Sequence, residues 1–263
     1  YVAYMTHNLV LIGAEVDKII VILLVTCVLA VALVRARRML RQAVADATVA
    51  RDLTRFVAPE VADRVATSDA AIRPGDGEVK TASVLFCDIE GFSTISERLA
   101  PDVLMATLNA YFAKVAEVIE QNGGVINQFL GDAMMITFNT ARPLADHAAA
   151  AVKTALAIQD LVQAERFGPD LQLKTRCGIN TGELVSGAVG TDVRLIFTVY
   201  GDEVNIAARL EQLNKTYGTY VLATEQTLAA AGMEVRGRPI GEVTVRGRQT
   251  PVNVFALDAE ISS

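Results

Sequence analysis

The chain has 263 residues, which is enough for one sizeable domain and an appendage. Its formal net charge of −6 argues against a nucleic-acid-binding protein, because such a protein needs a basic face. The three cysteines have neither the spacing of a metal site nor that of a disulfide framework. We expect them to be reduced, with two in the core of a cytosolic domain.

The first part of the chain contains a long apolar segment. Residues 19–34 carry no charge and are mostly Ile, Leu, Val and Ala, and residues 9–14 upstream are also apolar. A membrane-spanning helix needs roughly 20 apolar residues, and Lys18 can extend the shorter run by reaching the interface. We expect a transmembrane helix over about residues 12–34, within a membrane anchor of residues 1–34. The alternative is a buried helix of a soluble domain.

Charges at the two ends of this segment predict its orientation. Acidic residues precede the segment and four arginines follow it directly: Glu15 and Asp17, then Arg35, Arg37, Arg38 and Arg41. The positive-inside rule then puts the C-terminal side in the cytoplasm, with the anchor in the cell inner membrane. A cleaved signal peptide is disfavoured, because its basic residues would precede the apolar run. Since the chain begins at Tyr1 and not at Met, we expect it to be part of a longer protein.

Residues 35–77 are predicted to form a helical linker in the cytoplasm. Up to about residue 66 the segment is rich in helix formers. Small and apolar residues recur at heptad spacing: Leu33, Leu40, Ala47 and Thr54, with Ala36, Ala43, Ala50 and Val57. This weak heptad is compatible with a two-stranded coiled coil, and a single solvated helix is the alternative. Pro59 begins or kinks a short helix to residue 65, and turn-forming residues follow at 73–77.

The rest of the chain alternates between strand and helix patterns. Strands are predicted over residues 79–87, 125–130, 134–138, 171–180, 183–189, 221–223, 241–245 and 251–256. Helices are predicted over residues 101–121, 141–165 and 202–215, with a short one after residue 223. Gly131-Asp132 and Thr181-Gly182 are interpreted as the breaks between neighbouring strands. The pattern predicts an α+β sandwich, with one mostly antiparallel sheet and helices on one side.

Two aspartates lie next to apolar strands, where a carboxylate has no obvious structural use. Asp88 ends the apolar run of residues 82–87, and Asp132 directly precedes the apolar run of residues 133–136. A carboxylate beside a buried strand costs free energy unless it has a partner, and a hard divalent cation is the usual one. Two such carboxylates from different strands can hold one or two Mg²⁺ ions over a triphosphate.

Three motifs follow one another in the second part of the chain. The first is Phe-Cys-Asp-Ile-Glu-Gly-Phe at residues 86–92, the second covers residues 123–138 around Gly131-Asp132, and the third covers residues 198–211. Together they resemble the class III nucleotidyl cyclases over about residues 78–258, which leaves a tail of residues 259–263. The resemblance implies a ferredoxin-like βαββαβ core. It also implies conversion of a nucleoside triphosphate to a 3′,5′-cyclic monophosphate and pyrophosphate.

The resemblance assigns metal-binding residues. Asp88 and Asp132 match the two metal-binding aspartates of the family, and the backbone carbonyl of Ile89 would complete one metal site. Two ions per site are implied, either Mg²⁺ or Mn²⁺. One would lower the pKa of the substrate's own 3′-hydroxyl, which attacks the α-phosphorus, and both would neutralise the phosphates. No protein nucleophile is needed.

The resemblance also assigns residues that contact the ribose and the phosphates. Asn205 and Arg209 match the pair that orients the ribose and stabilises the transition state, and their spacing places them on one face of a predicted helix. Arg246 matches a basic position that contacts the terminal phosphates, where the family usually has Lys. The planar fork of Arg suits this chemistry because it grips phosphate oxygens in two places.

The two positions that select the purine depart in part from the family pattern. Gln128 stands where the family usually has Lys, and Thr198 stands where it has Asp or Thr. Gln can donate to N1 of adenine and Thr can accept from its N6 amino group, so ATP is the favoured substrate. The amide of Gln128 can also turn to suit guanine, and losing Lys weakens the discrimination. Gln128 is also compatible with an engineered or low-activity form.

In this family the active site forms between two catalytic domains, one giving the aspartates and the other the remaining residues. This chain has both sets, so the resemblance implies a head-to-tail homodimer with two equivalent sites. We therefore expect a homodimeric adenylyl cyclase, anchored in a lipid membrane and controlled by rotation of its domains. A guanylyl cyclase and a degenerate, regulatory cyclase domain are the alternatives. A diguanylate cyclase is disfavoured, because residues 130–134 lack its Gly-Gly-Asp/Glu-Glu-Phe signature.

Overall fold

The computed structural model describes residues 2–53, 73–191, 194–232, 237–243 and 251–257. The chain divides into two compact units, residues 1–57 and residues 58–263, which are described separately. Some predictions lie outside the described residues: the linker from residue 54 to residue 72 with its short helix at 59–65, Arg246 and the tail at 259–263.

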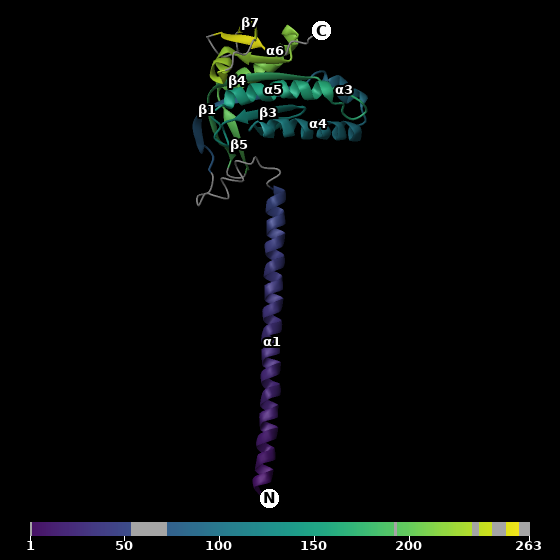
Figure 1. The fold of residues 1–263 in the computed structure, drawn as a ribbon, viewed down its shortest axis with the longest axis vertical. Helices are drawn as coiled ribbons and strands as arrows, with labels where there is room; N and C mark the ends of the chain where they lie inside the picture. Colours follow the sequence, from purple (N-terminus) through teal and green to yellow (C-terminus); the bar gives the residue numbers. More distant parts are fainter. Residues whose placement is uncertain (1, 54–72, 192–193, 233–236, 244–250, 258–263) are drawn as a thin grey trace. The chain divides into compact units, whose positions relative to one another are not determined.

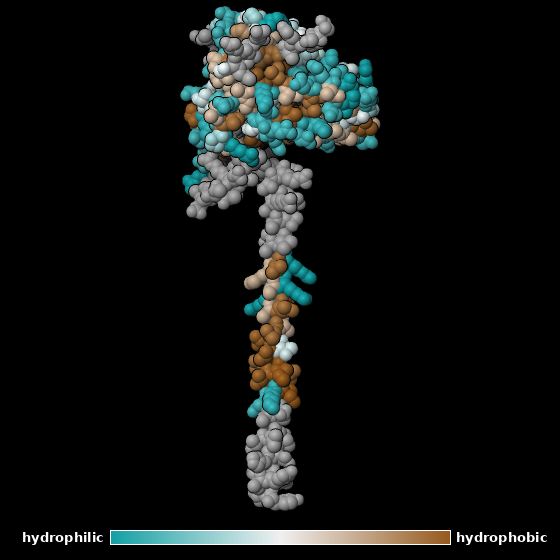
Figure 2. Space-filling view, viewed as in Figure 1, coloured by the Kyte–Doolittle hydropathy of each residue, from teal (hydrophilic) through white to brown (hydrophobic). Residues whose placement is uncertain are grey.

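The first unit contains one uninterrupted helix, α1 (Val2–Leu53) (Figure 1). Its segment Val16–Gln42 is long and apolar enough to cross a membrane. The apolar side chains of this segment are exposed, and Figure 2 shows them as a largely apolar band bounded by polar side chains. The helix is therefore a candidate span, and it continues into the predicted linker as far as Leu53. A single chain does not test the predicted coiled coil.

The second unit is built on an eight-stranded sheet (Figure 1). Its strands are β1 (Gly77–Ile89), β2 (Val125–Leu130), β3 (Ala133–Phe138), β4 (Thr175–Thr191), β5 (Arg194–Tyr200), β6 (Val221–Thr224), β7 (Arg238–Val243) and β8 (Val252–Ala256). Its helices are α3 (Phe92–Arg98), α4 (Pro101–Gln121), α5 (His147–Ala164), α6 (Asp202–Tyr217) and α7 (Glu225–Ala231).

The strand order is β2-β3-β1-β4-β6-β8-β7, and β5 pairs with β4. Strand β1 lies between β3 and β4 and is antiparallel to both, while β2 is antiparallel to β3. With α3 and α4 between β1 and β2, and α5 between β3 and β4, this part has the βαββαβ order that the sequence predicts. Strand β6 is parallel to β4, so the whole sheet is mixed.

Helices cover both faces of the sheet, and the prediction of helices on one side only was wrong. Leu85 and Cys87 belong to the large core that β1 forms with α4 and α5, which lie side by side (Figure 1). Ala82 and Val84 point to the other face, where Ala207 of α6 packs on them. The unbroken apolar run of β1 fits this arrangement, because a strand buried on both faces does not alternate with polar residues.

The two strands predicted around Thr181-Gly182 are one continuous strand, β4, which passes through both residues. Gly182 therefore does not form a turn. A Cβ atom at this position would lie 2.7 Å from Cδ of Glu203, so the missing side chain leaves room for the Glu203 side chain at the start of α6. The sequence prediction also missed strand β5 and helix α3, and α5 begins at His147 and not at residue 141.

Candidate active site

Asp88 and Asp132 meet at one end of the sheet. Asp88 is the penultimate residue of β1, and its neighbour Cys87 pairs with Met134 of β3. Asp132 lies in the turn of the β2–β3 hairpin, where Gly131 adopts a φ of 71°. Glycine takes up this left-handed conformation without strain. The carboxyl group of Asp132 lies close enough to that of Asp88 to raise its pKa, so the structure brings together the pair that the sequence singled out.

The surroundings of this pair raise the pKa of Asp88 from 3.8 to about 7. Burial is the largest cause, followed by the hydrogen bond to Asp132 and the negative charge of Asp132. The guanidinium of Arg176 and the backbone N–H of Ile89 act in the opposite direction. Two carboxylates in contact repel each other when both are charged, and a divalent cation relieves that repulsion. Their oxygen atoms are also the donors that Mg²⁺ and Mn²⁺ prefer, so the pair fits such an ion.

Arg176 lies opposite Asp88 in the antiparallel pairing of β1 with β4. Its Nη2 atom is 2.7 Å from Oε1 of Glu90, and the hydroxyl of Tyr220 donates to Oε2 of Glu90 at 2.9 Å. The charged hydrogen bond from Arg176 is the main cause that lowers the pKa of Glu90. These contacts fix the end of β1, which carries both Asp88 and the carbonyl of Ile89.

Glu211 brings a third carboxyl group toward the pair from α6. Glu211 is only 9% exposed. Burial is the main cause that raises the pKa of Glu211 to about 7, and the negative charge of Asp88 is the second cause. Gly178 of β4 makes this position possible, because a Cβ atom there would collide with the backbone nitrogen of Glu211. Among the described residues, no group of three His, Cys, Asp or Glu side chains is placed to hold a metal ion by itself.

Asn205 and Arg209 lie one turn apart on α6, and both are exposed. Arg209 donates to Oε1 of Gln212 on its own helix at 3.3 Å. Within the described part of the chain, neither residue forms a hydrogen bond or an ion pair with Asp88 or Asp132. Direct contact between the predicted metal-binding pair and the predicted ribose and phosphate pair is therefore not observed among the described residues of one chain.

The two predicted purine-reading residues lie at different levels of the sheet. Gln128 is exposed on β2 and pairs with Met135, which pairs with Phe86 near the carboxyl end of β1. Thr198 is 6% exposed on β5 and pairs with Gly187 of β4. Gly187 in turn pairs with Gly77, the first residue of β1. The strand register therefore does not bring the two side chains next to each other within one chain.

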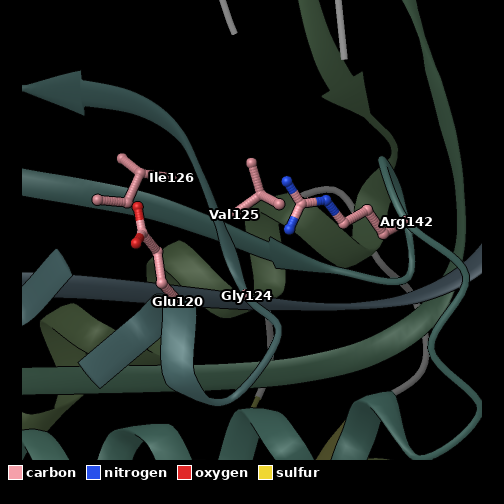
Figure 3. Close-up of a pocket in the computed structure, with 5 residues that line it drawn as sticks. All are labelled: Glu120, Gly124, Val125, Ile126 and Arg142. Carbon is pink, nitrogen blue, oxygen red and sulfur yellow. The ribbon is translucent and has the colours of Figure 1, made fainter. Parts of the chain in front are cut away.

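A separate pocket of about 420 Å³ lies at the start of β2 (Figure 3). Its lining combines an acidic, a basic and two apolar side chains with a glycine: Glu120, Arg142, Val125, Ile126 and Gly124. It lies at the opposite end of β2 from the turn that holds Asp132, and so it is not part of the acidic pair.

The sequence analysis assigned no role to Arg176 or to Glu211, although each leaves a trace in the sequence. Arg176 is a charged residue just before the apolar positions Cys177 and Ile179 of a strand. Glu211 falls in the buried stripe of α6, between Leu210 and Leu213, where an amphipathic helix ordinarily has apolar residues.

Comparison with known proteins places the second unit in context. A family model described as the adenylate and guanylate cyclase catalytic domain matches residues 76–259. Adenylate cyclase 1 of Rhizobium meliloti is 39% identical over 181 residues, which are 66% of this chain and 27% of that protein. The terminal-differentiation specific adenylate cyclase of Dictyostelium discoideum is 34% identical over 217 residues, 79% of this chain and 10% of that protein. The chain thus spans well under half the length of these relatives.

Solved structures of similar proteins share the fold. The crystal structure of the adenylyl cyclase CyaB from P. aeruginosa has a TM-score of 0.60 and 29% identity, and the match covers 70% of this chain and 96% of that one. A guanylyl cyclase crystal structure has a TM-score of 0.62 and 30% identity, and the match covers 69% of this chain and 93% of that one.

Proposed function

We propose that this chain, which belongs to the family of adenylate and guanylate cyclase catalytic domains, is an adenylyl cyclase that acts as a membrane-anchored homodimer. The observation that carries the proposal is the proximity of Asp88, at the end of β1, to Asp132 in the turn of the neighbouring hairpin. The reaction converts ATP to 3′,5′-cyclic AMP and pyrophosphate.

Asp88, Asp132 and the backbone carbonyl of Ile89 would hold two divalent cations, Mg²⁺ or Mn²⁺. When bound, the ions lower the pKa of the 3′-hydroxyl and neutralise phosphate charge. Arg176 acts as a positioning residue, because its bond to Glu90 fixes the end of the strand that carries these ligands. Arg246 would contact the terminal phosphates. The remaining catalytic requirement is to orient the ribose and to stabilise charge on the transferring phosphorus.

Asn205 and Arg209 are proposed to meet that requirement in the site of the partner subunit. Their exposure on α6, where Arg209 bonds only to Gln212 of the same helix among the described residues, supports a site shared between two chains. Arg209 would stabilise charge that develops in the transition state, through the two-pronged contact that Arg makes with phosphate. A two-fold dimer would then contain two equivalent sites.

Exposed apolar side chains next to the site elements also support a dimer. Phe129 and Leu130 directly precede the hairpin turn that holds Asp132, and Tyr200 ends β5, one residue before α6 begins. All three are large side chains that one chain leaves in contact with water. Apolar side chains gathered beside a functional site are a common feature of protein interfaces.

ATP is proposed as the substrate on two grounds. The relatives named adenylate cyclases are 33–39% identical to this chain over most of its length. Gln128 can donate its amide to N1 of adenine, and Thr198 can accept from the N6 amino group. Both residues would come from the chain that supplies Asn205 and Arg209, although the strand register does not make them neighbours.

The proposed organisation has an anchor at residues 1–34, a cytoplasmic helical linker at 35–77 and a catalytic domain at 78–258. The apolar segment of α1 supports the anchor, and the family match to residues 76–259 supports the catalytic domain. The positive-inside rule, applied to the four arginines after the apolar run, favours an inner-membrane protein with the catalytic domain in the cytoplasm.

The test is an assay of the purified full chain with ATP and with GTP, each in Mg²⁺, in Mn²⁺ and in EDTA. We expect cyclic AMP from ATP with a divalent cation, less cyclic GMP from GTP, and no product in EDTA. Asp88→Asn, which keeps the shape of the side chain but removes its charge, is the matched control and should be inactive. Cyclic GMP as the main product would identify a guanylyl cyclase. No product under any condition would support the degenerate regulatory domain.

A further inference from the structure

We infer that Glu211 completes the cation site of Asp88 and Asp132 by accepting hydrogen bonds from water molecules bound to the ion. The inference rests on the proposed function, because it deepens the account of the same site. It assigns a role to a buried carboxyl group that no other part of the mechanism uses.

The position of Glu211 is the first argument. The residue lies in the buried stripe of α6, whose other members include Ala207 and Leu210, and it faces the sheet. Gly178 of β4 lets the helix backbone approach there. Gly178 pairs with Phe86 of β1, two residues before Asp88, so Glu211 lies at the level of the acidic pair.

The second argument is that Glu211 has no donor. In the described part of the chain, no side chain or backbone group donates a hydrogen bond to its carboxylate. The residue is 9% exposed, and its carboxylate oxygens keep some contact with water. Its charged neighbours are Asp88 and Asp132, which repel it, and Arg176, whose guanidinium is already bonded to Glu90.

The kind of contact follows from the number of acidic side chains that can reach one ion. No three acidic side chains of the described residues are close enough to hold one ion together, so Glu211 is not a direct ligand beside both aspartates. Mg²⁺ bound by one or two carboxylates keeps several of its water molecules. Carboxylates that accept hydrogen bonds from such ligands orient them and raise the affinity for the metal. Glu211 would accept hydrogen bonds from such ligands at the site of Asp88 and Asp132.

One consequence concerns the dimer. Helix α6 carries Glu211 toward the acidic pair of its own chain, and it carries Asn205 and Arg209 on its exposed side. In a two-fold dimer, each α6 would therefore contribute to both sites. It would present Glu211 to one site and the Asn and Arg pair to the other.

The experiment measures Mn²⁺ binding to the full chain in detergent, without nucleotide, from the electron paramagnetic resonance signal of free Mn²⁺. Asp88→Ala should abolish binding at the site. Glu211→Gln should weaken it by about tenfold or more, as is typical when a group that orients a metal-bound ligand is changed. Glu117→Gln on the exposed side of α4 removes the same charge far from the pair and should bind like the wild type.

The folded state of each variant is checked by thermal unfolding in EDTA and in Mn²⁺. Glu211→Gln removes a carboxylate that faces two others, so its Tm in EDTA should not fall, while the rise in Tm caused by Mn²⁺ should shrink. If this variant does not fold, Glu211→Asp replaces it and should weaken Mn²⁺ binding by a smaller factor. Binding within twofold of the wild type in a folded Glu211 variant would overturn the inference and leave the proposed function intact. Unchanged binding in Asp88→Ala would remove the metal assignment itself.

Discussion

Arg176 lies directly opposite Asp88 in the pairing of β1 with β4, and its guanidinium is bonded to Glu90, two residues further along the chain. The same cation thus opposes the rise in the pKa of Asp88 and fixes the segment that contains Ile89. The acidic pair therefore owes its position to strand pairing and to this ion pair.

Loss of Arg176 should destabilise the catalytic domain. Arg176→Gln removes a charged hydrogen bond to Glu90, which is worth about 1.5–3 kcal/mol when buried. Because the Arg176 side chain is 13% exposed but that of Glu90 is 37% exposed, we expect about 1.5 kcal/mol, at the lower end of that range. The measurement is denaturant unfolding in EDTA. Arg166→Gln, at an exposed residue that donates only to nearby backbone carbonyls, should change stability by less than about 0.5 kcal/mol. Equal effects of the two substitutions would contradict this account.

Asp88 should make stability depend on pH when divalent cations are absent. Its pKa is about 7 in the folded protein and 3.8 ordinarily, so between these values the folded state binds more protons than the unfolded state. The free energy of unfolding should therefore fall as the pH rises from about 4 to about 7. Asp88→Asn should lose less stability over this interval than the wild type, as measured by denaturant unfolding in EDTA.

The comparison with Asp88→Asn removes the titration of Asp88 together with its effect on the pKa of Glu211. Burial lowers the pKa of His147, which makes stability rise with pH, and burial raises the pKa of Glu211. Both residues are present in the wild type and in the variant. If the two proteins show the same change with pH, Asp88 does not titrate as described.

The sequence located the acidic pair because carboxylates beside apolar strands are unusual. It was less informative where one residue type has two structural uses. Gly182 was interpreted as a break between strands, since glycine is common in turns, but it lies inside β4 beside the side chain of Glu203. Likewise, no local pattern places Arg176 opposite Asp88 or Glu211 near it. Those positions depend on the register of β1 with β4 and on the packing of α6, which join segments far apart in the chain.

The nature of the residue at position 128 should control the choice of purine. Gln128→Lys should raise the preference for ATP over GTP, because Lys donates a stronger, charged hydrogen bond to N1 of adenine. A hydrogen bond to a charged group is worth on the order of 1.5–3 kcal/mol, which corresponds to roughly a tenfold change or more. The measurement is the ratio of kcat/KM for the two nucleotides. An unchanged or inverted ratio would mean that Gln128 does not read the purine edge.

The apolar segment of α1 should anchor the chain in a membrane. The intact chain should require detergent or lipid to stay in solution, because the apolar side chains of Val16–Gln42 are exposed. Deletion of residues 1 to about 40 should give a protein that is soluble without detergent. Partitioning between a membrane pellet and the supernatant distinguishes the two forms. An intact chain that remains in the supernatant as a monomer would exclude the anchor.

Co-expression of two inactive variants tests the shared site most directly. Asp88→Ala removes the metal half of each site and Arg209→Ala removes the other half, so each homodimer should be inactive. A mixed dimer should contain one site with both defects and one with neither. The expected activity of co-purified, differently tagged variants is up to about a quarter of wild type, if chains pair randomly and the two sites act independently. Verified mixed dimers as inactive as their parents would contradict a site built from Asp88 of one chain and Arg209 of the other.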